Sequence, residues 1–244
     1  MPLPKYFKPK KKFSLLRLGQ NNDGGYLVGK KTVLQSKVLL SLGVSDDWSF
    51  EKDFLKINKQ TKLLCYDRHP LTKNFFLKEI IKSISIFDFK NVIYNIKKYI
   101  DYSNFFRSNK INKRLIRYKS LKKIINDENL NSNVFLKIDV EGSEYRILDD
   151  ILKYQDIICG LVIEFHDIDF HKKDLQNFFE KFKLRFTHVH VNNSAILDLE
   201  NNPTCLELTF EKNPEIIGEE PEIPHPQDQK NLSNFDDKFI NFEE

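Results

Sequence analysis

The order of apolar and polar positions divides the chain into short apolar runs that alternate with segments of helical spacing. Apolar runs of four to eight residues bounded by polar or turn residues are typical of buried strands. The runs expected as strands are 37–43, 62–67, 83–89, 133–140, 157–166, 185–191 and 204–210. Helices are expected over 49–59, 72–82, 143–154 and 171–183, and the basic, amphipathic residues 91–125 are expected to be helical with breaks.

This alternation predicts the fold class. Strands that alternate with helices imply parallel neighbours, because each parallel connection needs a crossover. The last two expected strands have no long helix between them, so we expect an antiparallel hairpin at one edge of the sheet. The sequence therefore predicts an α/β protein with a doubly wound, mostly parallel sheet. In such sheets, ligands bind at the carboxyl ends of the strands.

Composition narrows the class of protein. Hydrophobic residues make up 40% and charged residues 30% of the 244 residues, which excludes a disordered chain. No apolar run approaches the roughly 20 residues that span a bilayer, and the basic N-terminus lacks the apolar stretch of a secretory signal. Cys65, Cys159 and Cys205 are isolated and show no metal or disulfide spacing. We therefore expect a cytoplasmic protein without a transmembrane segment.

Charge is distributed unevenly along the chain. Residues 213–244 carry a net charge of −7, so the rest of the chain carries +11. The acidic segment holds four prolines but also several apolar residues, so we expect a tail that packs on a domain formed by residues 1–212. A basic body can attract nucleic acid, membranes or acidic glycans. No aromatic-interleaved motif accompanies the charge, which favours a solvated lysine-rich surface and no specific nucleic-acid partner.

Polar residues gather where the expected strands end. The first five end near acidic side chains, which a shared polar ligand explains better than chance: Asp46 and Asp47, Asp67, Asp88, Asp139, and Glu164 with His166 and Asp167. Gly43 lets the backbone approach a ligand, and Asp67 on the next strand can accept hydrogen bonds from ribose hydroxyls. A single glycine in this turn argues against a pyrophosphate cradle. The spacing thus fits an adenosine without phosphates, such as that of S-adenosylmethionine.

Several segments together resemble a known family. LKIDVEGSEYRIL (136–148) resembles the signature segment of the FkbM-type S-adenosylmethionine-dependent methyltransferases. Supporting segments follow the same order: NDGGYLV (22–28), SLGVSDDWSFEKDF (41–54), VIEFHDI (162–168), HVHVNN (188–193) and LELTF (206–210). The resemblance runs from about residue 15 to 212. YDRHP (66–70) departs from the usual Asp-Pro-x-Pro-like form, so the residues after Asp67 are not assigned.

The resemblance implies a Rossmann-like class I methyltransferase fold with a seven-stranded sheet, S-adenosylmethionine as cofactor, and O-methylation of sugars or similar hydroxyls, as in polysaccharide biosynthesis. It places the cofactor at the first three strand ends. The residues expected to bind it are Asp23, Gly24, Gly25, Gly43 and Asp67, with Asp88 at the adenine. The acceptor is expected to be a small-molecule or glycan hydroxyl, whose identity the sequence leaves open.

The catalytic residues are expected at the fourth and fifth strand ends. Asp139 closes an apolar strand, where an unpaired carboxylate is costly, so we expect it at the methyl-transfer centre. His166 is the candidate base and Glu164 orients it. Glu141 and Glu144 suit the positive end of a helix dipole, and their roles stay open.

Other interpretations of the site and of the class of protein remain open. His188 and His190 alternate along a strand and share one face, as metal ligands or as part of a polar face. No spacing is diagnostic of a metal, so no ligand is assigned and a divalent ion stays open. Asp167-Ile168-Asp169 resembles the Asp-x-Asp of metal-dependent glycosyltransferases, which is the alternative enzyme class. A non-catalytic binding protein of the same fold is the third reading, and the oligomeric state is open.

Overall fold

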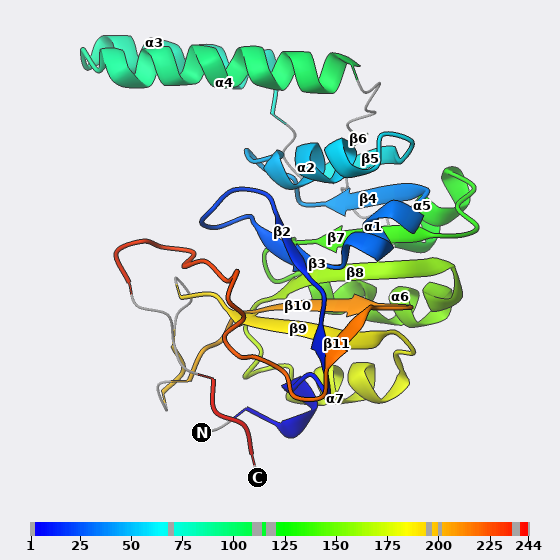
Figure 1. Ribbon diagram of the computed structural model, residues 1–244. Coiled ribbons are helices and arrows are strands. Elements are labelled where there is room, and N and C mark those ends of the chain that lie inside the picture. Colours follow the sequence, from blue (N-terminus) through cyan, green and yellow to red (C-terminus); the bar gives the residue numbers. More distant parts are fainter. Residues whose placement is uncertain are drawn as a thin grey trace.

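A seven-stranded sheet forms the centre of the protein, with strand order β6-β5-β4-β7-β8-β10-β9. The computed structural model describes residues 3–67, 71–108, 114–115, 121–193, 197–199, 202–235 and 240–243. The strands of the sheet are β4 (Val38–Leu42), β5 (Lys62–Asp67), β6 (Arg114–Leu115), β7 (Val134–Ile138), β8 (Ile158–Phe165), β9 (Arg185–Val191) and β10 (Leu206–Glu211). Figure 1 shows the strands stacked through the middle of the molecule.

The pairing of the strands confirms the predicted fold class. β6, β5, β4, β7 and β8 pair in parallel, whereas β10 is antiparallel to both β8 and β9. This is a doubly wound, mostly parallel sheet with the antiparallel pair β10–β9 at one edge. The carboxyl ends of the parallel strands therefore meet at one edge of the sheet, as a ligand site requires.

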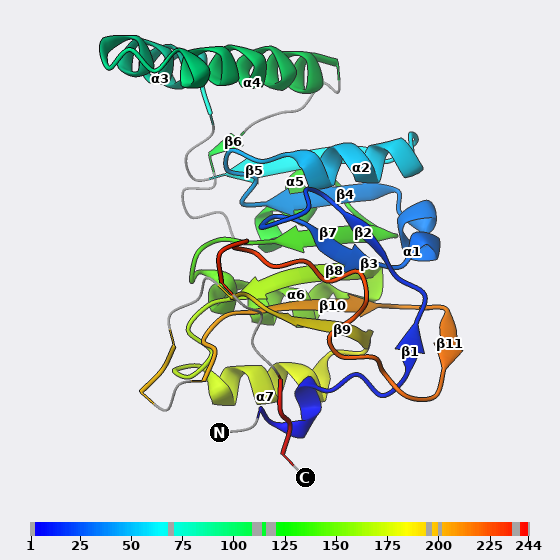
Figure 2. The ribbon, with the colours of Figure 1, turned by 60° about the vertical axis from the view of Figure 1, so that its left-hand side comes forward.

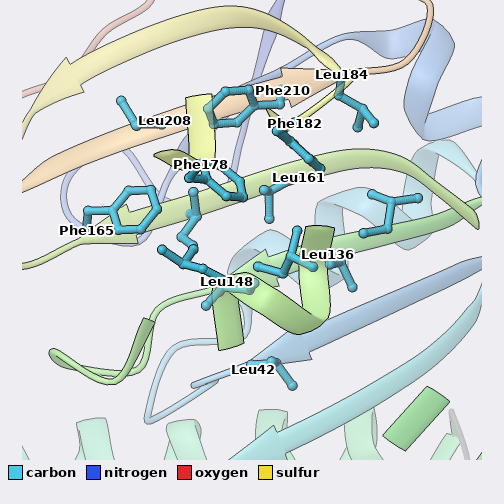
Figure 3. Close-up of a cluster of buried hydrophobic side chains, with 14 of the residues drawn as sticks. Leu42, Leu136, Leu148, Leu161, Phe165, Phe178, Phe182, Leu184, Leu208 and Phe210 are labelled. Carbon is cyan, nitrogen blue, oxygen red and sulfur yellow. The ribbon is translucent and has the colours of Figure 1, made fainter. Parts of the chain in front are cut away.

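Helices cover both faces of the sheet, and alternate strand residues pack against each layer. On one face Leu39 and Phe135 pack with residues of α1 (Lys30–Gln35) and α2 (Ser49–Ile57). On the other face the core includes α5 (Leu121–Asp127), α6 (Leu148–Tyr154) and α7 (Lys172–Lys181). Figure 3 shows this second cluster, where Leu136 and Leu161 of the sheet meet Leu148 and Phe178 of the helices. Short 3-10 turns lie at Lys5–Phe7, Glu144–Ile147 and Gln155–Ile157.

The segment after β5 departs from the sequence expectation. Residues 83–89 do not form a strand, because α3 (Lys73–Ser85) and α4 (Phe89–Ser108) are joined by a short turn into a helical hairpin. The hairpin projects from the top of the domain in Figures 1 and 2. The strand beyond β5 is instead the two-residue β6, within the basic segment 91–125 that also contains α4 and α5.

The two ends of the chain run beside each other. β1 (Lys12–Phe13) pairs with β11 (Ile216–Gly218), and Leu3 bridges to Phe242. Lys12 forms an ion pair of 2.6 Å with Glu222. A second small sheet pairs β2 (Leu16–Leu18) with β3 (Tyr26–Val28). In the part of the chain that is described, no helix combines the length and the apolar character needed to cross a membrane.

Candidate functional site

The turn after β4 brings three strand ends together. Gly43 has φ +81°, and a Cβ added there would lie 1.6 Å from the backbone oxygen of Asp139. Its N–H donates to the carbonyl of Tyr66 (2.9 Å), and the N–H of Asp139 donates to the carbonyl of Leu42 (3.0 Å). The sequence places glycine here because both the positive φ and the close approach exclude a side chain. Exposed backbone therefore lies at the edge where β4, β5 and β7 end.

Asp67 lies beside this turn. It is the last residue of β5, is half-buried, and accepts a hydrogen bond of 2.6 Å from the N–H of Ser45 through Oδ2. Ser45 itself has φ +48°, so the turn bends back toward the carboxylate. The expected pair of Gly43 and Asp67 is thus brought together at neighbouring strand ends.

The loop Asp23-Gly24-Gly25 folds against the same edge. A Cβ on Gly24, which has φ +84°, would lie 2.6 Å from Oδ2 of Asp47 in the turn that follows β4. Asp47 in turn accepts hydrogen bonds from the N–H (3.0 Å) and hydroxyl (2.9 Å) of Ser49 at the start of α2. The loop therefore approaches the first strand end closely, in the region where the cofactor is expected.

The structure corrects the predicted position of Asp88. Its expected strand is part of the helical hairpin, and Asp88 lies in the turn between α3 and α4 instead of at a strand end. Its carboxylate accepts hydrogen bonds from the N–H (3.1 Å) and side-chain amide (2.7 Å) of Asn91. Asp88 therefore caps α4, and the adenine role expected for it has no structural basis.

Asp139 and Glu164 lie at the centre of the site. The hydroxyl of Tyr26 lies 3.4 Å from Oδ2 of Asp139 and 3.3 Å from Oε2 of Glu164. Burial raises the pKa of both carboxyls, and the charge of Asp139 raises the pKa of Glu164 further. Glu164 also accepts hydrogen bonds from Asn192 (2.8 Å) and Cys205 (3.0 Å). The two acids expected at the reacting centre are therefore neighbours in an enclosed environment.

Lys137 is a buried cation in this centre that the sequence analysis did not single out. Its Nζ donates to the carbonyl of Gly43 (3.2 Å) and lies 5.5 Å from the centre of the Tyr26 ring. Burial lowers the pKa of Lys137, but the charges of Glu51 and Asp139 outweigh burial and raise it. The ammonium group therefore remains charged beside Asp139. The sequence does contain a signal for it: a lysine inside the apolar strand 134–138 must have an acidic partner, since an unpaired buried charge is costly.

His166 is surrounded by carboxylates. Its Nδ1 lies 3.2 Å from Glu144, and its Nε2 lies 3.5 Å from Glu141 and 3.9 Å from Glu164. Burial lowers the pKa of His166, but the bond to Glu144 and the charge of Glu164 outweigh it and raise the pKa to about 9. The ring in this arrangement carries a proton at neutral pH, which gives it the chemistry of a cation and proton donor. A base role for His166 requires that this proton first be lost.

The same cluster offers ligands for a divalent cation. Ligand atoms lie within 4.8 Å of one another in three overlapping groups, namely Asp139–Glu141–His166, Glu164–His166–Cys205 and Asp23–Glu164–Glu207. Carboxylate oxygens and imidazole nitrogens are ligands that divalent metals accept in proteins. Glu141 and Glu144, whose roles the sequence left open, both lie near the His166 ring.

His188 and His190 face the C-terminal segment. The Nε2 of His188 pairs with Asp228 at 2.9 Å, and the Nε2 of His190 lies 3.0 Å from the amide oxygen of Asn231. Asn231 also donates to Glu207 (2.6 Å), which stands opposite both Glu164 and His190 in the sheet. Burial raises the pKa of Glu207. The shared face expected for the two histidines is thus covered by residues 228 and 231.

The Asp167-Ile168-Asp169 segment follows β8. Asp167 has φ +51°, and Ile168 is buried and belongs to the hydrophobic core. The Oδ1 of Asp169 is buried without a hydrogen-bond partner among the described residues. The middle residue of this motif, Ile168, therefore packs in the hydrophobic core.

The strand order and one family model indicate the same class of protein. A doubly wound seven-stranded sheet with the order described above defines a class I methyltransferase fold. Residues 92–192 match the family model of the methyltransferase FkbM domain. The match covers less than half of the chain and includes LKIDVEGSE, so the resemblance of this segment to the FkbM-type methyltransferases is confirmed. Asp23, Gly43 and Asp67 lie outside the matched segment.

Solved structures similar to this chain include a precorrin-6y C5,15-methyltransferase from Geobacter metallireducens (11% identity, 75% of this chain and 86% of that chain covered, TM-score 0.40). The Methanococcus jannaschii fibrillarin pre-rRNA processing protein (11%, 74% and 68%, TM-score 0.40) and the human methyltransferase 10 domain containing protein (13%, 73% and 72%, TM-score 0.42) are further examples. Likenesses at this level carry no argument about activity. No curated protein matches the sequence.

Proposed function

We propose that the protein transfers a methyl group from S-adenosylmethionine to a hydroxyl of a sugar or glycan. The observation that carries the proposal is the edge formed by Gly43, Asp67 and Asp139. Backbone without a side chain lies at the end of β4, the carboxylate of Asp67 lies at the end of β5, and the backbone oxygen of Asp139 lies against the glycine. This arrangement fits an adenosine lying across β4 and β5 with its reactive end toward β7.

The cofactor binding that follows from this edge has defined parts. Asp67 would accept hydrogen bonds from the ribose hydroxyls, and the loop Asp23-Gly24-Gly25 would close over the cofactor from the side of Asp47. S-adenosylmethionine supplies an activated methyl group on a positively charged sulfur. The carboxylates of the site complement that charge, because opposite charges attract strongly in an enclosed site.

The residues around Asp139 would prepare the acceptor. Methyl transfer is an in-line displacement, so the hydroxyl oxygen must be aligned and its proton removed. Burial raises the pKa of Asp139, which makes the carboxylate a better proton acceptor than an exposed aspartate. The hydroxyl of Tyr26 lies 3.4 Å from this carboxylate, and the positive charge of Lys137 acts on it electrostatically. We therefore assign proton removal to Asp139 and orientation of the acceptor to Glu164 and His166.

The charge of the site favours a neutral acceptor. Asp23, Asp139, Glu164 and Glu207 gather at the same edge, and two or more carboxylates repel a phosphate brought between them. Sugar hydroxyls, in contrast, donate hydrogen bonds to carboxylates. This supports a glycan hydroxyl over a nucleic-acid backbone as the acceptor.

A divalent cation is an optional part of this proposal. The groups around His166 fit one, and a metal there would lower the pKa of a bound hydroxyl. Exhaustive chelation followed by metal analysis and an activity assay decides its role. Activity that falls with chelator and returns with Mg²⁺ or Mn²⁺ assigns the carboxylates to a metal, whereas full activity leaves them to the acceptor.

Isotope transfer tests the function as a whole. The protein is incubated with S-adenosylmethionine labelled in the methyl group and with a panel of mono- and oligosaccharides, and products are analysed by mass spectrometry. Labelled methyl ethers are expected with wild type and not with Asp139→Asn. Parallel titration with sugar nucleotides tests the glycosyltransferase reading, and cofactor binding without transfer to any acceptor would favour a binding protein.

A further inference from the structure

The helical hairpin exposes an unusual amount of apolar surface. Seven large side chains along α3 and α4 are between 41% and 63% exposed, namely Leu77, Ile81, Ile84, Phe89, Ile93, Ile96 and Ile100. Within each helix their spacing alternates between four and three residues. This is the spacing of a helix stripe that packs against other helices. The hairpin therefore carries two stripes that look like helix-packing seams but are exposed.

The contacts between α3 and α4 show where these stripes lie. Phe76 is buried between the helices, with its ring 5.3 Å from Tyr99 and 5.2 Å from Tyr102. Each exposed stripe is offset by one residue from the residues packed between the helices, as Leu77 follows Phe76 and Ile100 follows Tyr99. One residue is a rotation of about 100° around the helix axis. Because the helices are antiparallel, the two rotations turn toward the same side, so the stripes form one continuous apolar face.

The other side of the hairpin faces the domain. Lys98 pairs with Asp46 at the end of β4, and Asp101 bonds Trp48 (2.9 Å) and Lys52 (2.6 Å) beside and within α2. These two α4 residues lie one position before Tyr99 and Tyr102, and thus on the side opposite Ile100. The apolar face therefore points away from the domain. Figure 1 shows the hairpin itself above α2.

We propose that this face binds the same face of a second copy of the chain, and that the two hairpins form a four-helix bundle. Seven half-exposed side chains present on the order of 600 Å² of apolar surface, which is at the upper limit for a patch on a monomer. It approaches the roughly 800 Å² per partner of a stable interface. A twofold axis through the face brings each stripe against a stripe of the partner, as closed homodimers require.

The polar residues next to the face fit this arrangement. Lys78, Lys90 and Lys97 each follow a residue of the apolar stripe and are exposed. In a four-helix bundle such positions lie on the outer surface, where long charged side chains remain in water. The site edge at β4, β5 and β7 is left free, so both copies keep an accessible site.

Sedimentation of the full chain over a range of concentrations tests the proposal. Wild type is expected to sediment at twice the 29.0 kDa chain mass. The double variant Ile93→Gln, Ile96→Gln removes apolar contact from both copies, and its dimer dissociation constant is expected to rise about tenfold or more. Tyr94→Gln changes an exposed residue of the same helix outside the stripe and is expected to leave the dimer intact. Circular dichroism checks that all three proteins are folded.

A wild type that is monomeric at about 100 μM, or a double variant that dimerises like wild type, overturns the proposal. A surface with both basic and apolar residues can also bind a membrane, and vesicles of anionic phospholipid test this alternative. Binding of monomeric wild type to these vesicles, lost in the double variant, would assign the face to a membrane and would also overturn the dimer. Dimerisation that is lost only in the double variant supports it.

Discussion

The backbone oxygen of Asp139 occupies the position where a side chain at Gly43 would begin, 1.6 Å from an added Cβ. The contact joins the edge proposed to bind the cofactor to the acid proposed to react, through the main chain of two adjacent parallel strands. Because backbone cannot move aside as a flexible side chain can, the strand ends are fixed relative to each other. Cofactor position and acid position are therefore coupled.

Gly43→Ala should disrupt this contact. Gly142→Ala is a matched control, because Gly142 also has positive φ (+84°) but a Cβ there would meet only Asp167 Oδ2, at 4.0 Å. The control pays the left-handed backbone cost of about 1–2 kcal/mol. We expect Gly43→Ala to lose clearly more unfolding free energy and at least about tenfold in cofactor affinity. Equal losses in the two variants, measured by denaturation and calorimetry, would contradict the coupling.

Asp139→Asn should separate chemistry from binding. The amide keeps the size of the side chain, so the fold and cofactor affinity should survive within a few-fold. Turnover should fall by about 10²–10⁴, the usual range for a positioned acid or base. Asp149→Asn is the control, since this acid in the first turn of α6 is exposed and should affect turnover far less. Near-normal turnover, or a drop in melting temperature that explains the lost rate, would remove Asp139 from the reaction.

The contact between the C-terminal segment and β9 should depend on pH. Burial lowers the pKa of His190, but the bond to Asp228 and the charge of Glu207 outweigh it and raise the pKa to about 9. An unfolded histidine has a pKa near 6.5, so this stabilisation is complete below pH 6.5 and is lost as the pH rises through 9. The loss should be at most about 3 kcal/mol.

Asp228→Asn isolates this part of the pH dependence. His166 titrates over the same range, so the wild-type slope alone does not identify His190. We expect the free energy of unfolding of the variant to be lower at pH 6.5 and to depend less on pH up to 9.5. If the unfolding free energies of wild type and Asp228→Asn change with pH in parallel, the ion pair with the histidines contributes nothing to the pH dependence of stability.

The sheet could be predicted from the sequence because its strands are continuous apolar runs. Residues 83–89 show where the pattern misleads. The segment Ser-Ile-Ser-Ile-Phe alternates as a strand does, yet Ile84 also continues the stripe of Leu77 and Ile81 with helical spacing. The segment up to Ser85 belongs to the helix α3, so Asp88 lies in the hairpin turn and not at the sheet edge. β6 has only two residues, too few for any pattern to indicate.

The sequence indicates residues of the candidate site where each lies at one strand end, and gives no signal where contacts join residues distant in sequence. Gly43, Asp67, Asp139 and Glu164 each lie within one residue of the end of a strand, so the sheet brings them together. The contact of Asp228 with His188 joins segments 40 residues apart that share no local pattern. The charge of His166 likewise depends on Glu144, which reaches it through the fold.

Calorimetric titration of S-adenosylmethionine into wild type, Asp67→Ala and Asp88→Ala tests the central claim, that the cofactor lies across the ends of β4 and β5. Loss of charge-assisted hydrogen bonds worth about 1.5–3 kcal/mol should weaken binding to Asp67→Ala by roughly 10- to 150-fold. Asp88→Ala, altered at the hairpin tip, should bind as wild type does. No binding to wild type, or equal affinity for a folded Asp67→Ala, would contradict the account.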